Sequence, residues 1–400
     1  MRNINTKFSK FLLMPAVVMN VNVAAFDSLP QPDEPPAYLK LIEHFHLEKN
    51  MNQNPGFYKS TGVDTAMTLQ GCLDKELAVS KKRYEKNFGI ALVDLSGKKL
   101  EKPEYAGYNS TIAMYGASQS KMGALLAIHQ LRYDIEKLGQ KLASEKTGAE
   151  PLLMAELIAA AKSSFGGGNS LFKIKDKFSF SGSGKDIKVQ LSEKMKKELI
   201  QMMRISNNYV ASVVIKKIGF NYINSVLWQS GIYDKNRGGG LWVGRAYAGG
   251  KFWHRDPVAK LSHGTNSLSM VKYLTLLEQG RLVSPKDSES IKYFLSDTRF
   301  RIKFVRGIMD LGLKVNNYAK AVKDPTRKAT IWRKSGTMKG SHRISHDAIL
   351  VERQVCKDKE CNNKVLLRYA AAGVSQYAAV RGMRLWGKQL DRCIQKNNGI

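Results

Sequence analysis

The sequence predicts an α+β fold, in which a five-stranded antiparallel sheet is flanked by helices and joined to an all-helical lobe. Strand-like runs lie near both ends of the chain, and helical periodicity fills the middle. An apolar fraction of 43% in 400 residues is sufficient for a large core. Because two or three short strands make only a marginal sheet, the strands from the two ends are expected to pair with each other.

The N-terminal part of the fold begins with a predicted helix at 66–86, where apolar residues recur at roughly helical spacing with charges between them. The run FGIALVDL at Phe88–Leu95 predicts a strand, and the turn Ser96–Lys99 follows it. A second strand is expected at 104–110.

Helices predominate in the middle of the chain. One is expected to begin near Ser118 and to end at about Arg132. Residues 163–186 are rich in glycine, serine and lysine, which predicts a long flexible insertion. Further helices are predicted at 151–162, 191–204, 208–217, 220–230 and 267–279.

Strands return late in the sequence, and one helix follows them at about 377–393. The first and last helices are expected to cover one face of the sheet. The predicted organisation is a discontinuous α/β lobe at 61–110 and 325–396, with a helical lobe at 111–324. The late strands are predicted at 329–334, 347–354 and 365–374.

The N-terminus predicts an export signal at 1–25, with a basic start, a short apolar run and small residues at 23–25. A retained membrane anchor is the alternative, although a proline and two asparagines weaken the segment as a span. Residues 26–60 contain five prolines and predict an N-terminal arm on the surface. The protein is therefore expected to be periplasmic or secreted, with association to the cell envelope left open.

Four cysteines in an exported chain predict two disulfides. Cys356 and Cys361 flank a polar turn between two apolar runs, which leaves Cys72 to pair with Cys393. Four free thiols or a metal site are the alternatives. The cysteine spacing does not suit a metal, and neither a metal nor another cofactor is expected.

The net charge of +30 falls to +27 without the three basic residues of the presumed signal. Such a charge attracts polyanions, and an anionic cell-wall polymer is one candidate partner. A solvated basic surface is an equal alternative. The sequence has no arginine-rich arm or nucleic-acid motif, so a nucleic-acid partner is not expected, and the oligomeric state is left open.

Three short motifs occur in a fixed order: S-x-x-K at Ser118, S-x-N at Ser206 and K-S-G-T at Lys334. Each is weak alone, because S-x-x-K also matches at Ser96 and Ser170. The context distinguishes them: only Ser118 opens an apolar helix, and Lys334 ends a strand.

The first motif suits nucleophilic catalysis. Residues three apart at a helix start share one face, so Lys121 can take the proton of the Ser118 hydroxyl. Burial beside a second cation, Lys334, favours the neutral form that a base requires. Ser206 can shuttle a proton, and Asn208 can hold a substrate amide.

The third motif suits binding of an extended acyl substrate along a strand. Gly336 would allow the backbones of the strand and the substrate to approach closely. The backbone N–H groups of Ser118 and Thr337 could bind the oxyanion that forms during acyl transfer.

This constellation resembles the serine β-lactamases and penicillin-binding proteins, and it is most similar to class A β-lactamase-like serine hydrolases. The similarity extends over about 66–395 and implies a β-lactamase/transpeptidase-like fold. It implies Ser118 as the acylated nucleophile and Lys121 as the base, with Ser206 and Asn208 as the middle motif. It further implies that the substrate carboxylate is held by Lys334, Ser335 and Thr337.

One departure from the family pattern concerns deacylation. Class A enzymes carry a glutamate between the second and third motifs that activates the deacylating water. Here the only acids between Asn208 and Glu278 are Asp234 and Asp256. Asp256 or His254 is a candidate for positioning a water, and the alternative is that both are ordinary loop-anchoring groups.

The sequence therefore predicts a serine acyl hydrolase that acts on β-lactams or on D-Ala-D-Ala-type amides. The missing glutamate favours the alternative of a cell-wall carboxypeptidase or endopeptidase that releases β-lactams slowly. A catalytically idle protein that binds peptidoglycan or another cell-wall polymer is a further alternative.

Overall fold

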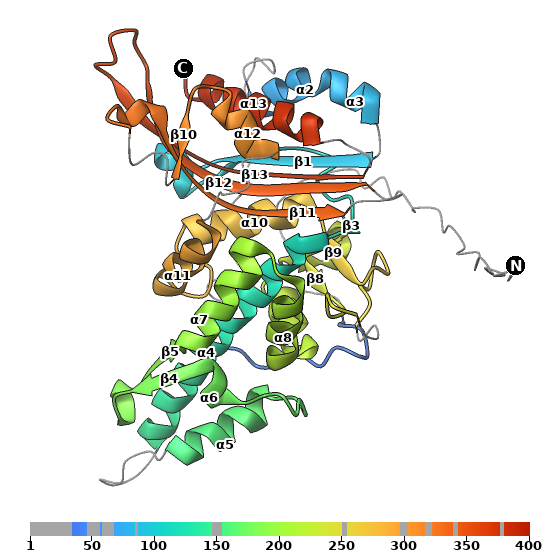
Figure 1. Ribbon diagram of the computed structural model, residues 1–400, viewed down its shortest axis with the longest axis vertical. Helices are drawn as coiled ribbons and strands as arrows, with labels where there is room; N and C mark the ends of the chain where they lie inside the picture. The colour runs from blue at the N-terminus through green and yellow to red at the C-terminus, as the bar shows by residue number, and fades with distance from the viewer. Residues whose placement is uncertain are drawn as a thin grey trace, which may run out of the picture.

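The computed structural model describes residues 34–45, 57, 68–84, 87–145, 154–249, 254–296, 303–316, 322–338, 343–376 and 380–400. Figure 1 shows a sheet that has one group of helices on one face and a larger, mostly helical lobe beneath the other. The predicted α+β class is confirmed.

The main sheet contains all five predicted strands, which form consecutive antiparallel pairs in the order β11-β12-β13-β1-β2. A sixth strand of two residues, β10, pairs in parallel with the start of β11 and makes the sheet mixed. This strand was not predicted, because two residues carry no detectable alternation. The strands are β1 (Phe88–Asp94), β2 (Glu104–Tyr108), β10 (Lys314–Val315), β11 (Lys328–Met338), β12 (Ile344–Cys356) and β13 (Lys364–Ser375).

The outer face of the sheet is covered by the first and last helices, as predicted (Figure 1). Trp386 lies fully buried in this layer, stacks on Phe88 at a ring-centroid distance of 4.9 Å and donates a hydrogen bond to Ser80 Oγ. Burial of this large aromatic side chain contributes to the packing of the last helix on the sheet. The helices are α2 (Leu69–Glu76), α3 (Ala78–Tyr84), α12 (Lys303–Met309) and α13 (Val380–Asn397).

The inner face packs on α10 (Ser267–Glu278), from which the helical lobe extends away from the sheet (Figure 1). The other helices of this lobe are α4 (Lys121–Glu145), α5 (Met154–Phe165), α6 (Ile174–Lys177), α7 (Glu193–Ile200), α8 (Asn208–Ile218), α9 (Phe220–Gln229) and α11 (Pro285–Leu295). Three small sheets interrupt the lobe: β3-β9-β8, β4-β5 and β6-β7. Their strands are β3 (Met114–Tyr115), β4 (Phe178–Ser181), β5 (Lys188–Leu191), β6 (Tyr233–Asp234), β7 (Gly239–Gly240), β8 (Trp242–Val243) and β9 (His263–Thr265).

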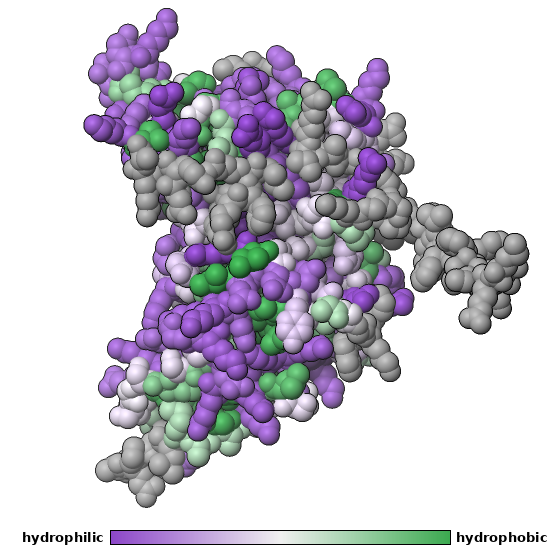
Figure 2. Space-filling view, in the orientation of Figure 1, coloured by the Kyte–Doolittle hydropathy of each residue, from purple (hydrophilic) through white to green (hydrophobic). Residues whose placement is uncertain are grey.

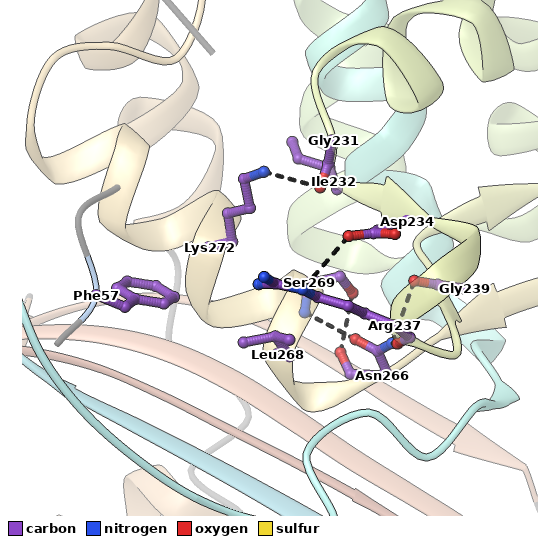
Figure 3. A pocket seen from close by; sticks show the side chains of 10 residues that line it. All are labelled: Phe57, Gly231, Ile232, Asp234, Arg237, Gly239, Asn266, Leu268, Ser269 and Lys272. Carbon is purple, nitrogen blue, oxygen red and sulfur yellow. Dashed lines mark hydrogen bonds and ion pairs between the residues drawn. The ribbon is translucent and has the colours of Figure 1, made fainter. Parts of the chain in front are cut away.

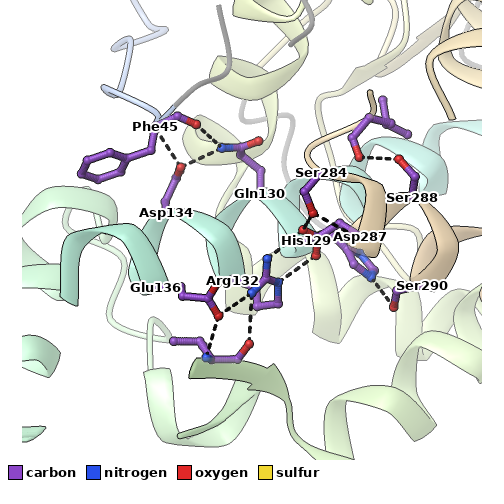
Figure 4. A network of polar contacts seen from close by, with 12 residues as sticks. Phe45, His129, Gln130, Arg132, Asp134, Glu136, Ser284, Asp287, Ser288 and Ser290 are labelled. Carbon is purple, nitrogen blue, oxygen red and sulfur yellow. Dashed lines mark hydrogen bonds and ion pairs between the residues drawn. The ribbon is translucent and has the colours of Figure 1, made fainter. Parts of the chain in front are cut away.

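The central helix α4 is anchored to α11 by a buried ion pair. Arg132 donates to both carboxylate oxygens of Asp287 at 2.7 Å, and it also bonds Glu136 (Figure 4). Bidentate geometry of this kind fixes the orientation of both groups. The contact holds α4, and therefore the motif at its start, in a defined position in the lobe.

The predicted flexible insertion at 163–186 is instead folded. It contains the end of α5, the short helix α6 and strand β4 (Phe178–Ser181), which pairs with β5 (Lys188–Leu191). Phe165, Phe172 and Ile174 are buried in the core of the lobe. These few apolar residues are spaced irregularly among glycines, so the sequence shows no periodicity for them.

Residues 34–45, within the predicted arm at 26–60, lie along α9. Asn221, Ser225 and Gln229 follow one another at intervals of four on this helix, and each hydrogen-bonds to the backbone of the segment. The predicted signal at 1–25 lies outside the described residues. Over the part of the chain that the structure describes, no helix has the length and apolar character to cross a membrane.

The surface seen in Figure 2 is largely hydrophilic, with small apolar areas scattered over the helical lobe. This agrees with the high charge of the chain, which is +30 in total. Spread charge favours solubility and general attraction of polyanions, and no single anionic partner follows from it.

Both predicted disulfides are present, Cys72–Cys393 between α2 and α13 and Cys356–Cys361 at the tip of the β12–β13 hairpin. The two sequence separations are 321 and 5 residues. Closing the longer loop restricts the unfolded chain more strongly.

We expect removal of Cys72–Cys393, by changing both cysteines to alanine, to lower the free energy of unfolding by about 4–5 kcal/mol. Removal of Cys356–Cys361 in the same way should lower it by less than about 3 kcal/mol, because the loop-closure entropy is smaller. Urea unfolding of the two double variants under oxidising conditions checks this. Equal losses would show that loop entropy does not decide the difference.

Candidate active site

Ser118 lies in a tight turn that joins strand β3 (Met114–Tyr115) to α4. A 3-10 helix spans Ala117–Ser120, and the α-helix begins at Lys121 and extends to Glu145, beyond its predicted end. Ala117 has a φ of +43°, a conformation that is rare for a residue with a side chain. Strain of this kind is found where neighbouring contacts hold the backbone, often at functional sites.

The S-x-N motif follows a single π-helical turn, Gln201–Ile205, at the end of α7. Ser206 itself adopts a left-handed conformation with φ +62°. Asn207 then caps α8 by accepting a hydrogen bond from Val210 N at 3.1 Å. The π-helical turn before Ser206 and the Asn207 cap after it hold the backbone of Ser206 in this left-handed conformation. They thereby fix the direction in which its side chain projects.

Lys121 is fully buried and points at this second motif. Its Nζ donates to Ser206 O at 2.7 Å, to Ser206 Oγ at 3.1 Å and to Asn208 Oδ1 at 2.8 Å. Lys334 approaches from β11, and its Nζ donates to Ser206 Oγ at 2.9 Å and to Met203 O at 3.0 Å. The structure therefore brings Lys121, Ser206, Asn208 and Lys334 into one cluster. Lys121 lies three residues after Ser118 in the sequence.

The two lysines lie in an environment that disfavours their charge. Burial lowers the pKa of Lys121 to about 7. Burial also lowers the pKa of Lys334 well below its usual value, and the charges of Lys121, Arg333 and Lys303 add to this effect. Asp347 lies close by but forms a buried ion pair with Arg333 at 2.7 Å. A lysine in this state can act as a base near neutral pH.

The end of β11 packs against the turn that carries Ser118. A Cβ atom on Gly336 would lie 2.9 Å from Gly116 O and 3.2 Å from Ala117 Cβ. Glycine is therefore required here because the strand packs closely on the protein's own turn. From the sequence, the expected reason was the close approach of a substrate backbone. Ser335 is partly buried and Thr337 is exposed on the same strand.

Lys303 is a neighbour of the third motif that the sequence did not predict. This fully buried residue opens α12, and its Nζ donates to Gly336 O at 2.7 Å, Thr337 Oγ1 at 2.8 Å and His346 O at 2.7 Å. Burial lowers its pKa to about 7. Through these hydrogen bonds Lys303 holds Gly336 and Thr337 in place. No motif or periodicity near residue 303 predicts this role.

The structure gives Asp256 an anchoring position in the loop between β8 (Trp242–Val243) and β9 (His263–Thr265). Asp256 Oδ1 accepts hydrogen bonds from Tyr233 OH at 2.8 Å and from two backbone N–H groups within the loop. The hydrogen bonds of His254 run through its backbone, to Gly244 and Trp242. These contacts are what loop-anchoring residues make, and they do not include Lys121 or Ser206.

Tyr247, one of the described residues of the same loop, does reach the cluster. Its hydroxyl donates to Ala117 O at 2.7 Å, and Lys121 Nζ lies 4.7 Å from its ring centroid. No local sequence pattern indicates Tyr247, because its contacts join positions far apart in the chain.

A separate pocket lies at the start of α10 and contains none of the predicted site residues. Figure 3 shows Lys272 directed at the backbone of Gly231, to whose oxygen it donates at 2.9 Å. The lining residues are Phe57, Gly231, Ile232, Asp234, Arg237, Gly239, Asn266, Leu268, Ser269 and Lys272. Across the described ranges of the chain, no group of three or more His, Cys, Asp or Glu side chains could hold a metal ion.

The family model of the beta-lactamase enzyme family matches residues 151–358, which is more than half of the chain and includes the second and third motifs. The chain belongs to the beta-lactamase enzyme family.

Solved structures similar to this one are beta-lactamases and a protein described as PBP-A. The beta-lactamase from Sphaerobacter thermophilus DSM 20745 is 12% identical, with a TM-score of 0.46, over 84% of this chain and 99% of that chain. The chromosome-encoded beta-lactamase of Vibrio parahaemolyticus is 13% identical, with a TM-score of 0.44, over 82% and 98%. PBP-A is 14% identical, with a TM-score of 0.45, over 82% and 97%. No curated protein matches the chain.

Proposed function

We propose that this protein is a serine acyl hydrolase that acts on β-lactams or on D-Ala-D-Ala-type amides through an acyl-Ser118 intermediate. The observation that carries the proposal is the hydroxyl of Ser206, which lies within hydrogen-bond distance of both Lys121 Nζ and Lys334 Nζ beside the Ser118 turn. Membership of the beta-lactamase enzyme family supports the same chemistry.

In this proposal Lys121, as the neutral amine, takes the proton from the Ser118 hydroxyl as its oxygen attacks the acyl carbonyl. The proton then passes through Ser206 to the leaving nitrogen. The backbone N–H groups of Ser118 and Thr337 bind the oxyanion, and each such donor contributes about 3–4 kcal/mol. Asn208 holds the substrate amide.

The substrate carboxylate is proposed to bind at Lys334, Ser335 and Thr337. Two lysine amines support the assignment, since Lys334 lies on this strand and Lys303 bonds Thr337, and a bound carboxylate would favour their charged forms. A carboxylate is common to penicillins and to peptides that end in D-alanine, so it does not distinguish the two substrate classes.

A cell-wall carboxypeptidase or endopeptidase is the second candidate, and the position of Asp256 favours it. Its carboxylate is held by Tyr233 and by the loop backbone. A site without an acid poised beside the acyl ester releases a β-lactam slowly, as penicillin-binding proteins do. Two disulfides support export to the periplasm or beyond.

Intact-mass spectrometry after mixing with benzylpenicillin tests the proposal. We expect the mass of one whole penicillin to be added per chain and to persist for minutes, because acylation opens the lactam ring without releasing a fragment. Peptide mapping should locate the adduct at Ser118. If no adduct forms and the antibiotic stays intact, the acyl-serine mechanism does not apply; rapid loss of the antibiotic without an adduct would instead indicate a β-lactamase.

A further inference from the structure

Tyr247 occupies the place in the loop that lies next to the proposed base and nucleophile. Its ring contacts Lys121 Nζ, 4.7 Å from the ring centroid, and stacks on the ring of His263 at 4.4 Å and 15°. Its hydroxyl bonds Ala117 O, immediately before Ser118. One side chain thus contacts both Lys121 and the backbone that presents Ser118.

The segment around Tyr247 is itself fixed to the S-x-N helix. Ala248 N donates to Ser212 Oγ at 2.8 Å, and the Ser212 hydroxyl donates to Asn208 O at 2.9 Å. These two bonds connect the loop to α8 one turn after Asn208. The position of the Tyr247 ring is therefore set by the same helix that carries the middle motif.

The ring acts on Lys121 in two opposite ways. An apolar wall excludes water and lowers the pKa of an amine, whereas the negative face of an aromatic ring attracts an ammonium group and raises it. Burial dominates at Lys121, whose pKa is lowered to about 7. Lys334 and His263 are ionisable neighbours of Lys121, and the charge of Lys121 helps to lower the pKa of each. Arg245 also lowers the pKa of His263, and Tyr115 raises the pKa of Tyr247.

Tyr247 cannot take the place of a carboxylate base. Burial raises the pKa of its phenol well above 10, so the hydroxyl stays protonated at neutral pH. Burial also lowers the pKa of His263 to about 3, so its imidazole is uncharged there. A role for Tyr247 must therefore come from shape and shielding, not from proton transfer.

We propose that Tyr247 is a positioning residue for acylation, in which its ring shields Lys121 from water and its hydroxyl holds the Ala117 carbonyl and thereby the Ser118 turn. This inference rests on the proposed function. The two contacts make separate predictions, because the ring and the hydroxyl can be removed independently.

The test compares Tyr247→Phe, which keeps the ring, with Tyr247→Ala, which removes it. The first readout is the titration midpoint of Lys121, followed by NMR of protein labelled with ¹³C at lysine Cε and assigned with Lys121→Arg. The second is the pH dependence of acylation by a chromogenic cephalosporin. Tyr133→Ala, which removes a tyrosine from the distal part of α4, is the control and should change neither readout.

In Tyr247→Ala we expect the Lys121 midpoint and the acidic limb of acylation to move together to higher pH by about one unit or more. In Tyr247→Phe the midpoint should stay, and acylation should slow by about threefold to tenfold through the lost hydrogen bond. An unmoved or lowered midpoint in Tyr247→Ala overturns the shielding role, and an unchanged rate in Tyr247→Phe overturns the hydroxyl's role. Failure of the wild-type protein to acylate contradicts the proposed function, while the NMR midpoint still decides the shielding role.

Discussion

Ser118→Ala is expected to abolish covalent acylation while leaving the fold intact. The substitution removes one hydroxyl from a partly exposed position in the 3-10 turn, so the free energy of unfolding should change by no more than about 0.5 kcal/mol. Under the proposed mechanism no acyl ester can form without the hydroxyl. The rate of β-lactam opening should therefore fall by at least about 10⁴-fold, as in serine hydrolases that lose their nucleophile. The measurements are intact mass after mixing with penicillin and thermal unfolding.

The chain offers a matched control for this variant. Ser170 also begins an S-x-x-K sequence, but it is exposed in a turn of the helical lobe. Ser170→Ala should therefore acylate at the wild-type rate. Undiminished turnover in Ser118→Ala would show that a different residue carries the acyl group and would remove the basis for the whole mechanism.

The three motifs could be recognised in the sequence because each is local. S-x-x-K places Ser118 and Lys121 on one face of a helix start, whatever the rest of the fold does. Lys334 could be placed on a strand because a run of β-branched and aromatic residues precedes it, but the predicted strand end at Lys334 was wrong, since β11 continues to Met338 along β12. The five main strands were found for the same reason, since alternation and β-branched residues are properties of short windows.

The residues that the sequence missed make long-range contacts. Tyr247 meets Lys121 and Ala117, and Lys303 meets Gly336 and Thr337, only because distant segments fold together. Their local sequence carries no signature. Likewise the role of Gly336 depends on β11 packing against the turn that carries Ser118, which no single segment encodes.

The loop between β8 and β9 has consequences for the second half of the reaction. Hydrolysis of an acyl ester needs a base that activates water, and a well-placed general base accelerates such a step by about 10²–10⁴-fold. Tyr247, the loop residue in contact with Lys121, carries a phenol that stays protonated. Asp256 is held by Tyr233 and the loop backbone. In the proposed mechanism Lys121 serves as the base for both steps, and the acylation step protonates it until the proton is passed on.

We therefore expect burst kinetics with penicillins, with one equivalent opened quickly and a steady state slower by about 10²–10⁴-fold, since the second step lacks a dedicated base. The fast phase should rise with pH through about 7, because burial lowers the pKa of Lys121 to that value and only the neutral amine accepts the proton. Lys121→Ala should slow the fast phase by about 10²–10⁴-fold.

Asp256→Ala and His254→Ala should change the slow phase far less. Asp256→Asn separates loop anchoring from catalysis, because asparagine can keep the hydrogen bonds from the loop backbone but is not a base. Stopped-flow absorbance over a pH series measures both phases. A linear, burst-free progress curve with high turnover that is lost in both Asp256 variants would show that Asp256 replaces the missing glutamate.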